Sequence, residues 1–99
     1  MAQFNMSFGH GQPWDAARVN FEVMIERARR EYARWVHSVA WSEDRTSARL
    51  AGPSYEVVVN LDPMRVRARG RVPFAFKLLE PSIRRHVERV LRDQRSESA

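Results

Sequence analysis

The sequence predicts an α+β fold in which one antiparallel sheet of about five strands is covered on one face by two helices. Short segments alternate apolar and polar side chains, which is typical of strands with one buried face. Two longer segments repeat apolar residues every three or four positions, which is typical of amphipathic helices. Short connections separate the last four strand segments, so these strands are expected to pair in antiparallel. The expected order is β-α-β-β-β-β-α.

The first strand is expected at Phe4, Met6 and Phe8, which alternate with polar residues. It lies either at a free edge of the sheet or beside the last strand. A helix of about six turns is then expected over residues 14–36, because Pro13 suits the first turn of a helix and apolar residues recur at helical spacing behind it. Its apolar residues are Trp14, Ala17, Phe21, Met24, Ile25, Ala28, Tyr32, Trp35 and Val36.

Four further strands are expected in a meander. Residues 38–42 and 47–50 alternate on either side of a polar turn, and Gly52-Pro53 breaks the chain after them. The longest alternation, over residues 55–71, predicts a β-hairpin with one apolar face and one polar face. With Asp62 and Pro63 as the two turn residues, the expected neighbours across the hairpin are Leu61 with Met64, Val59 with Val66, Val57 with Ala68 and Glu56 with Arg69.

The last helix is expected to start at Pro81, after an apolar linker or first helical turn over residues 74–80. Its apolar face holds Ile83, Val87, Val90 and Leu91. We expect residues 1–93 to form a single domain and residues 94–99 to form a polar C-terminal tail.

Composition limits the class of protein. The chain is 43% hydrophobic and 29% charged, which is typical of soluble globular proteins. No apolar run approaches the roughly 20 residues that a membrane span needs, and the N-terminus has no secretory-signal pattern, so a cytoplasmic protein without a transmembrane segment is expected. The absence of cysteine fits a reducing compartment. The net charge is +5, and almost all of the basic residues are arginine. This charge either favours anionic partners or serves only to keep the protein soluble.

No residue pattern indicates an enzyme. His10, His37 and His86 lie on different predicted elements without metal-ligand spacing, and no pair of carboxylates suggests acid–base chemistry. No glycine-rich phosphate loop is present either. We therefore expect no catalytic residue, no metal and no cofactor.

Arginine occupies every second position of the second hairpin strand. The candidate anion-binding residues, here called the arginine face, are Arg49, Arg65, Arg67, Arg69 and Arg71. Side chains two positions apart on a strand are about 7 Å apart, close to the spacing of phosphates along a nucleic-acid strand. The arginine face therefore suggests nucleic acid as a partner. The alternative is a solvated face whose charges discourage pairing of sheet edges.

Apolar side chains follow the hairpin. Phe74, Phe76, Leu78 and Leu79 are the candidates for an exposed contact with a hydrophobic surface or with a second copy of the chain in a homodimer. A lipid-type ligand between the long helix and the sheet is a further possibility. The residues considered for such a cavity are Trp14, Phe21, Trp35, Trp41, Phe74 and Phe76. In a chain this small we expect them to fill the core instead.

Taken in order, these features resemble the small bacterial polyhydroxyalkanoic acid system proteins, from about Phe4 to Leu91. The matching positions are His10, Ala17-Arg18, Trp41, Gly52, Val66, Val72-Pro73-Phe74, Pro81, Ile83, Val87-Glu88 and Leu91. The resemblance implies an accessory, non-enzymatic role near storage-polyester granules, with the granule surface or a granule-associated protein as partner. It supplies no active-site residue, and His10 is expected to be a structural cap before the helix. The uniform arginine face departs from the mixed charges of the family.

Overall fold

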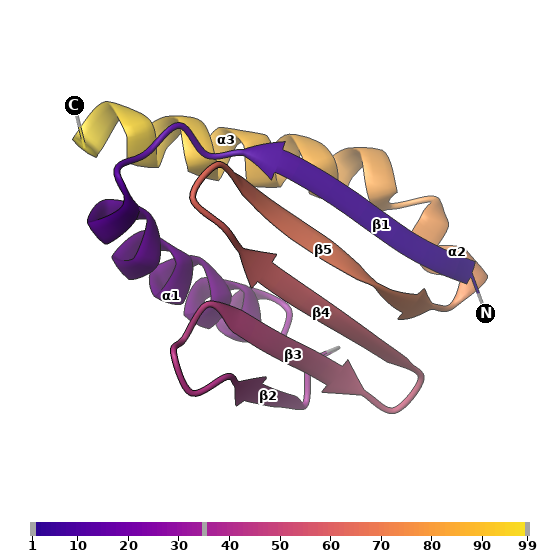
Figure 1. Ribbon diagram of the computed structural model, residues 1–99. Coiled ribbons are helices and arrows are strands. Elements are labelled where there is room, and N and C mark those ends of the chain that lie inside the picture. The colour runs from indigo at the N-terminus through magenta and orange to yellow at the C-terminus, as the bar shows by residue number, and fades with distance from the viewer. Residues whose placement is uncertain (1, 35, 99) are drawn as a thin grey trace.

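The computed structural model describes the backbone of residues 2–34 and 36–98, and the side chains of these residues apart from 76, 77 and 95–98. Five strands form one antiparallel sheet in the order β1-β5-β4-β3-β2 (Figure 1). The strands are β1 (Ala2–Gly9), β2 (Ser38–Trp41), β3 (Ser47–Gly52), β4 (Tyr55–Leu61) and β5 (Arg65–Val72). The helices are α1 (Trp14–Glu31), α2 (Phe74–Lys77) and α3 (Glu80–Ser98).

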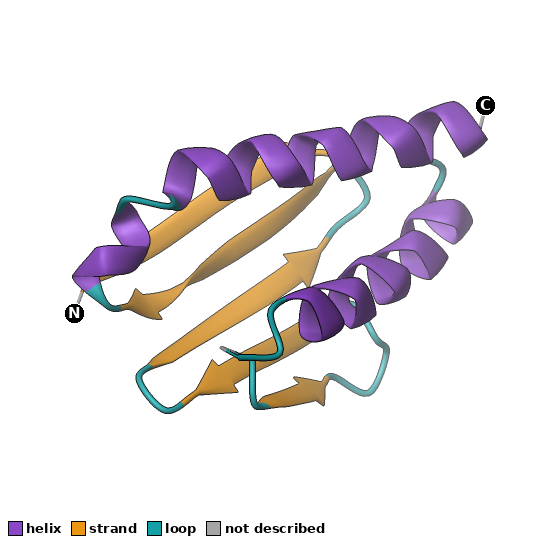
Figure 2. Ribbon diagram, turned by 180° about the vertical axis from the view of Figure 1, so that it is seen from behind, coloured by secondary structure: helices purple, strands orange, loops and turns teal. Residues whose placement is uncertain are grey.

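Both long helices lie on the same face of the sheet, and none of the described helices lies on the opposite face (Figure 2). The α+β class and the predicted order of elements are therefore confirmed. The two alternatives for the first strand are both true, because β1 lies at an edge of the sheet and also pairs with the last strand, β5. Phe4, Met6 and Phe8 point into the core as the alternation predicts.

The predicted register of the hairpin is wrong by two residues. Leu61 faces Val66, Val59 faces Ala68, Val57 faces Gly70 and Glu56 faces Arg71. Because side chains alternate with a period of two, this shift leaves every residue on its predicted face. The patterning therefore fixed the two faces of the hairpin but not its pairing.

The chemistry of Asp62 explains the shift. Its carboxylate accepts hydrogen bonds from the backbone N–H groups of Met64 and Arg65, at 2.8 and 2.6 Å, and its own N–H bonds to the carbonyl of Arg65 at 2.9 Å. Asp62 is thus the first residue of the turn, and Pro63 and Met64 are its two central residues. Aspartate is favoured at that first position and proline at the second.

Two helix ends differ from the prediction. α1 ends at Glu31, because the chain then turns so that Ser38 pairs with Ala51 in β2 and β3; Trp35 lies outside the described residues. At the other end, α3 continues to Ser98, so the segment expected as a polar tail is helical. Gln94 is buried there and bonds to residues of α1 and of the segment before it.

The turn at Asp62 predicts a pH dependence of stability. Hydrogen bonds from the backbone N–H groups of Met64 and Arg65 lower the pKa of Asp62 below its usual value of 3.8. The ionised carboxylate therefore stabilises the fold above about pH 4, and this contribution is lost as the pH falls through the lowered pKa. Asp62→Asn keeps an acceptor oxygen but carries no charge.

We expect urea denaturation to show that wild type is more stable than Asp62→Asn at pH 7 and that the difference shrinks steadily below pH 4. Parallel stability profiles for the two proteins between pH 7 and pH 2 would contradict this account of the turn.

Candidate functional site

The interior consists of two apolar clusters that do not fully meet. One joins α1 to the middle strands, and the other joins α3 to β1 and β5. Met24, Val36, Val57 and Ala68 are only partly buried and pack against both clusters. Val57 and Ala68 lie on β4 and β5, which have a neighbouring strand on both sides, and they face the helices. The centre of the apolar sheet face is therefore incompletely covered.

The arrangement of the helices causes this gap. In Figure 2, α1 and α3 lie close together where α1 begins and α3 ends, and they diverge toward the other end of the sheet. Gln94 ties the close end: its side chain accepts a hydrogen bond from Gln12 at 3.3 Å and donates one to the backbone carbonyl of Asn20 at 3.3 Å. Asn20 in turn donates to the Gln12 side chain at 2.7 Å. We call this end the apex.

His10 anchors the apex to the sheet. It is almost completely buried, at 1% exposure. Its Nδ1 accepts the backbone N–H of Gln12 at 3.1 Å, so the proton lies on Nε2, which donates to the backbone carbonyl of Asp62 at 2.9 Å. Both ring nitrogens are thus used within the fold. The histidine therefore has a structural role in holding the segment before α1, but the expectation that it caps the helix is wrong, because the N-cap is Pro13 and, among the described residues, no side chain bonds to the helix start.

Between the diverging helices lies a groove with a volume of about 340 Å³. Its floor is formed by the apolar residues of β1, β3, β4 and β5, and its walls are formed by α1 and α3. Because the side chain of Ala68 is small, the groove is deepest at the middle of the sheet. Tyr55 is the floor residue that carries a polar atom, and burial raises the pKa of its phenol. The groove therefore offers an almost entirely apolar surface.

The open end of the groove, here called the mouth, is polar. Arg27 and Tyr32 of the α1 side, and Ser82 and His86 of α3, line it. Glu31 bridges the helices there, with its carboxylate 3.8 Å from Arg27 Nε and 3.4 Å from His86 Nε2. The rings of Tyr32 and His86 meet edge to face, with centroids 6.4 Å apart. An elongated molecule in the groove would thus meet apolar groups along its length and polar groups at one end.

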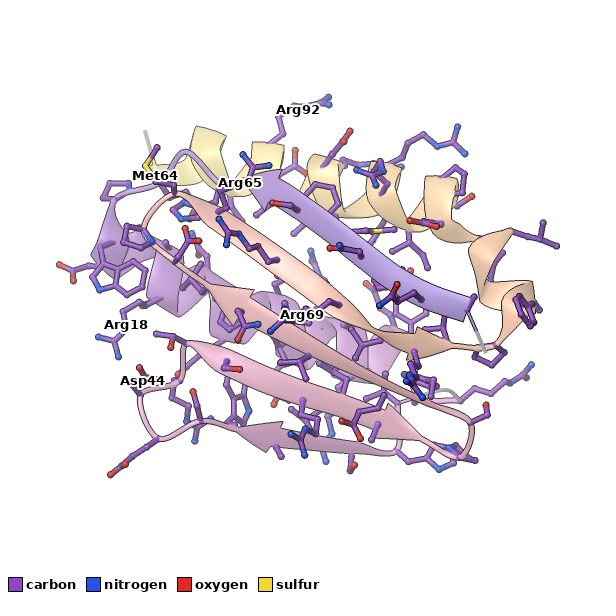
Figure 3. The ribbon with its side chains drawn as sticks, turned by 45° about the vertical axis from the view of Figure 1, so that its right-hand side comes forward. Arg18, Asp44, Met64, Arg65, Arg69 and Arg92 are labelled. Atoms are coloured by element: carbon purple, nitrogen blue, oxygen red, sulfur yellow. The ribbon has the colours of Figure 1, made fainter. Side chains whose placement is uncertain are left out.

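The arginine face lies on the opposite side of the sheet. Arg65, Arg67, Arg69 and Arg71 are all exposed on β5, and Figure 3 shows Arg65 and Arg69 on the face without helices. Arg67 pairs with the Asp62 carboxylate at 3.6 Å, and Arg65 donates to the Ser7 hydroxyl at 2.6 Å. The structure thus brings the β5 arginines together in one row, as predicted.

Ion pairs neutralise part of the positive charge of the arginine face. Arg49, on β3, pairs with Glu56 at 3.4 Å. Within the described part of the chain, Arg69 and Arg71 have no ion-pair partner. The register places them beside Asn5 and Gln3 on the β1 side. On the β4 side it places them beside Val58 and Glu56, and the Glu56 carboxylate pairs with Arg49. Within the described residues, Arg69 thus has neither an ion pair nor a carboxylate opposite it, whereas Arg71 faces a carboxylate that Arg49 already contacts.

The apolar residues after the hairpin are exposed, as predicted. Phe74, Leu78 and Leu79 are 71%, 84% and 49% exposed, and the side chain of Phe76 lies outside the described residues. Leu79 also lines the groove. We call Phe74, Leu78 and Leu79 the apolar patch. It adjoins the mouth.

The expectation that aromatic residues would leave no room for a cavity is wrong. Trp14, Phe21, Trp41 and Phe74 do not line the groove; Phe21 and Trp41 instead pack edge to face in the cluster next to α1, with centroids 5.8 Å apart. Sequence patterning predicted which residues face the helices, but it carries no signal for the angle between two helices. Alanine at position 68, midway along a central strand, was the one available hint of space.

Among the residues that the structure describes, no group of three or more histidine, aspartate or glutamate side chains is placed to hold a metal ion. No described helix is long and apolar enough to cross a membrane. Comparisons with protein-family models, with curated proteins and with solved structures found no match to this chain.

Proposed function

We propose that this chain is a non-enzymatic binding protein whose groove holds one aliphatic chain, and that it acts as an accessory protein of a storage-polyester system. The observation that carries the proposal is the incompletely covered centre of the sheet, where the partly buried Val57 and Ala68 form the floor of a groove of about 340 Å³. Apolar side chains on the central strands of a sheet are normally covered. An occupant would complete the core.

The size and shape of the groove favour a single small chain over a partner helix. A volume of about 340 Å³ lies at the lower end of the range for small-molecule sites, roughly 300 to 1,000 Å³. The apex closes one end, so a long helix has no continuous channel to lie in. Each methylene group buried there would contribute about 0.8 kcal/mol, which makes a medium-length aliphatic chain a sufficient ligand.

The apolar patch links the groove to a polyester surface. Leu79 belongs both to the patch and to the groove lining, so a surface that contacts the patch lies next to the mouth. The resemblance to polyhydroxyalkanoic acid system proteins implies that this surface is a storage granule in the cytoplasm. We propose that the patch rests on the granule, or on a granule-associated protein, while the groove accepts an aliphatic chain from it.

Filling the floor of the groove tests ligand binding. In isothermal titration with methyl 3-hydroxyoctanoate, a capped repeat unit of a polyhydroxyalkanoate, wild type is expected to bind and Ala68→Leu to lose about tenfold in affinity, because the larger leucine side chain occupies the floor. The matched control is Ala40→Leu, which adds the same atoms to the exposed face of β2. Absence of binding by wild type, or equal binding by folded Ala68→Leu, would contradict the proposal.

Substitutions in the apolar patch test the proposed contact with the granule. The double variant Phe74→Ser, Leu78→Ser is expected to lose co-sedimentation with purified polyester granules while keeping the melting temperature of wild type, since both side chains are exposed. Val19→Ser removes an exposed apolar side chain from α1 and serves as the control. If the double variant sediments with granules as wild type does, the patch is not the contact; sedimentation velocity then shows whether the patch joins two copies of the chain.

A second candidate function is the binding of nucleic acid by the arginine face. It is favoured by Arg69 and Arg71, which are exposed and, among the described residues, unpaired with any carboxylate. None of the described residues on this sheet face is aromatic, so bases would find no stacking platform. Such binding would therefore involve the phosphate backbone and be independent of sequence.

Salt dependence tests this second function. If it holds, short DNA and RNA bind at 50 mM salt, lose most of their affinity at 200 mM, and are bound weakly by Arg69→Ser, Arg71→Ser at either concentration. Arg29→Ser, on the exposed side of α1, is the charge-matched control for one arginine. Binding that is insensitive to salt, or equal in the double variant, would exclude the arginine face as a phosphate site.

A further inference from the structure

We infer that the mouth of the groove recognises a carboxylate, and hence that the preferred ligand is a free aliphatic acid whose head group takes the place of the Glu31 side chain between Arg27 and His86. The inference rests on the proposed function, because it names the ligand class of the same groove. It adds a charge preference that an apolar groove alone does not imply.

The first argument is the convergence of nitrogen-bearing side chains from both helices at the mouth. Arg27 of α1 and His86 of α3 both line the groove, and their nitrogens approach one carboxylate, that of Glu31, at 3.8 and 3.4 Å. The described lining of the groove contains no aspartate or glutamate. The Glu31 carboxylate lies beside this lining and already contacts both side chains, so a second carboxylate that entered from the groove would meet the same two groups.

The second argument is that Glu31 is held loosely. Distances of 3.4 and 3.8 Å exceed the roughly 2.7 to 2.9 Å of a charge-assisted hydrogen bond. The Glu31 side chain is 45% exposed, and exposed pairs of this kind contribute little to stability. Glu31 can therefore turn into solvent at small cost and leave Arg27 and His86 to an incoming carboxylate.

The third argument is the presence of further donors beside this position. The hydroxyl of Ser82 lines the groove, and Arg85 lies 3.5 Å from its oxygen. Tyr32 packs against the His86 ring and so fixes its position relative to α1. A carboxylate at the mouth would thus have donors from both helices, while its aliphatic chain lies on Val57 and Ala68. Hydrolysis of a polyester ester bond releases a molecule of this class, a free hydroxy acid.

The test compares 3-hydroxyoctanoic acid with its methyl ester by isothermal titration at pH 7 and low salt. These ligands have the same chain and differ in the charge of the head. Wild type is expected to bind the acid about tenfold more tightly than the ester. Arg27→Gln is expected to bring the acid down to the affinity of the ester, and Glu31→Gln to bind the acid several-fold more tightly with no change for the ester, because the competing carboxylate is gone.

Arg29→Gln is the matched control, since Arg29 pairs with Glu26 at 4.0 Å and does not line the groove; it is expected to retain the preference of wild type. Equal binding of acid and ester by wild type, or weaker binding of the acid by Glu31→Gln, would overturn the carboxylate site while leaving the apolar groove intact. Binding of neither ligand would refute the proposed function itself.

Discussion

Two helices must cover the apolar face of a five-stranded sheet, and the rest of this structure follows from how they do so. The sheet is about 19 Å across its strands, which two helices span only if they pack side by side along their full length. Here α1 and α3 are tied together at the apex by Gln94 and diverge from it. The helices cover the apolar sheet face completely at the apex and incompletely toward the mouth. The groove is the uncovered part of that face.

The polar residues of the inner layer lie at the two ends of this arrangement. At the apex, His10, Gln12 and Gln94 are buried, and their bonds to one another and to neighbouring backbone groups satisfy them within the fold. At the mouth, Glu31 and His86 form long, partly exposed contacts. Buried polar groups with full hydrogen bonding rigidify a structure, whereas loose exposed pairs do not. The apex therefore holds the helices together, whereas the contacts at the mouth constrain them little, which is the basis of the carboxylate site proposed there.

The sequence predicts the elements of this fold and the face on which each side chain lies, because both follow from local periodicity. It places Phe4 and Leu50 in the core, and it places Arg65, Arg67, Arg69 and Arg71 on the open face. The hairpin register depended on the role of Asp62 in its turn, which periodicity does not report, and the edge position of β1 depended on long-range pairing. The groove could not be predicted because it arises from the angle between α1 and α3. That angle depends on hydrogen bonds among Gln12, Asn20 and Gln94, which are distant in the sequence.

The most direct test of the central claim is an isotope-filtered NMR experiment that detects contacts between an unlabelled aliphatic acid and the ¹³C-labelled methyl groups of the protein. The groove predicts nuclear Overhauser effects from the ligand chain to Val57 and Ala68, at the centre of the sheet. Effects confined to Leu78, or to Val58 on the open face, would contradict it, because the ligand would then lie on the apolar patch or beside the arginine face and the space between the helices would be only a packing defect.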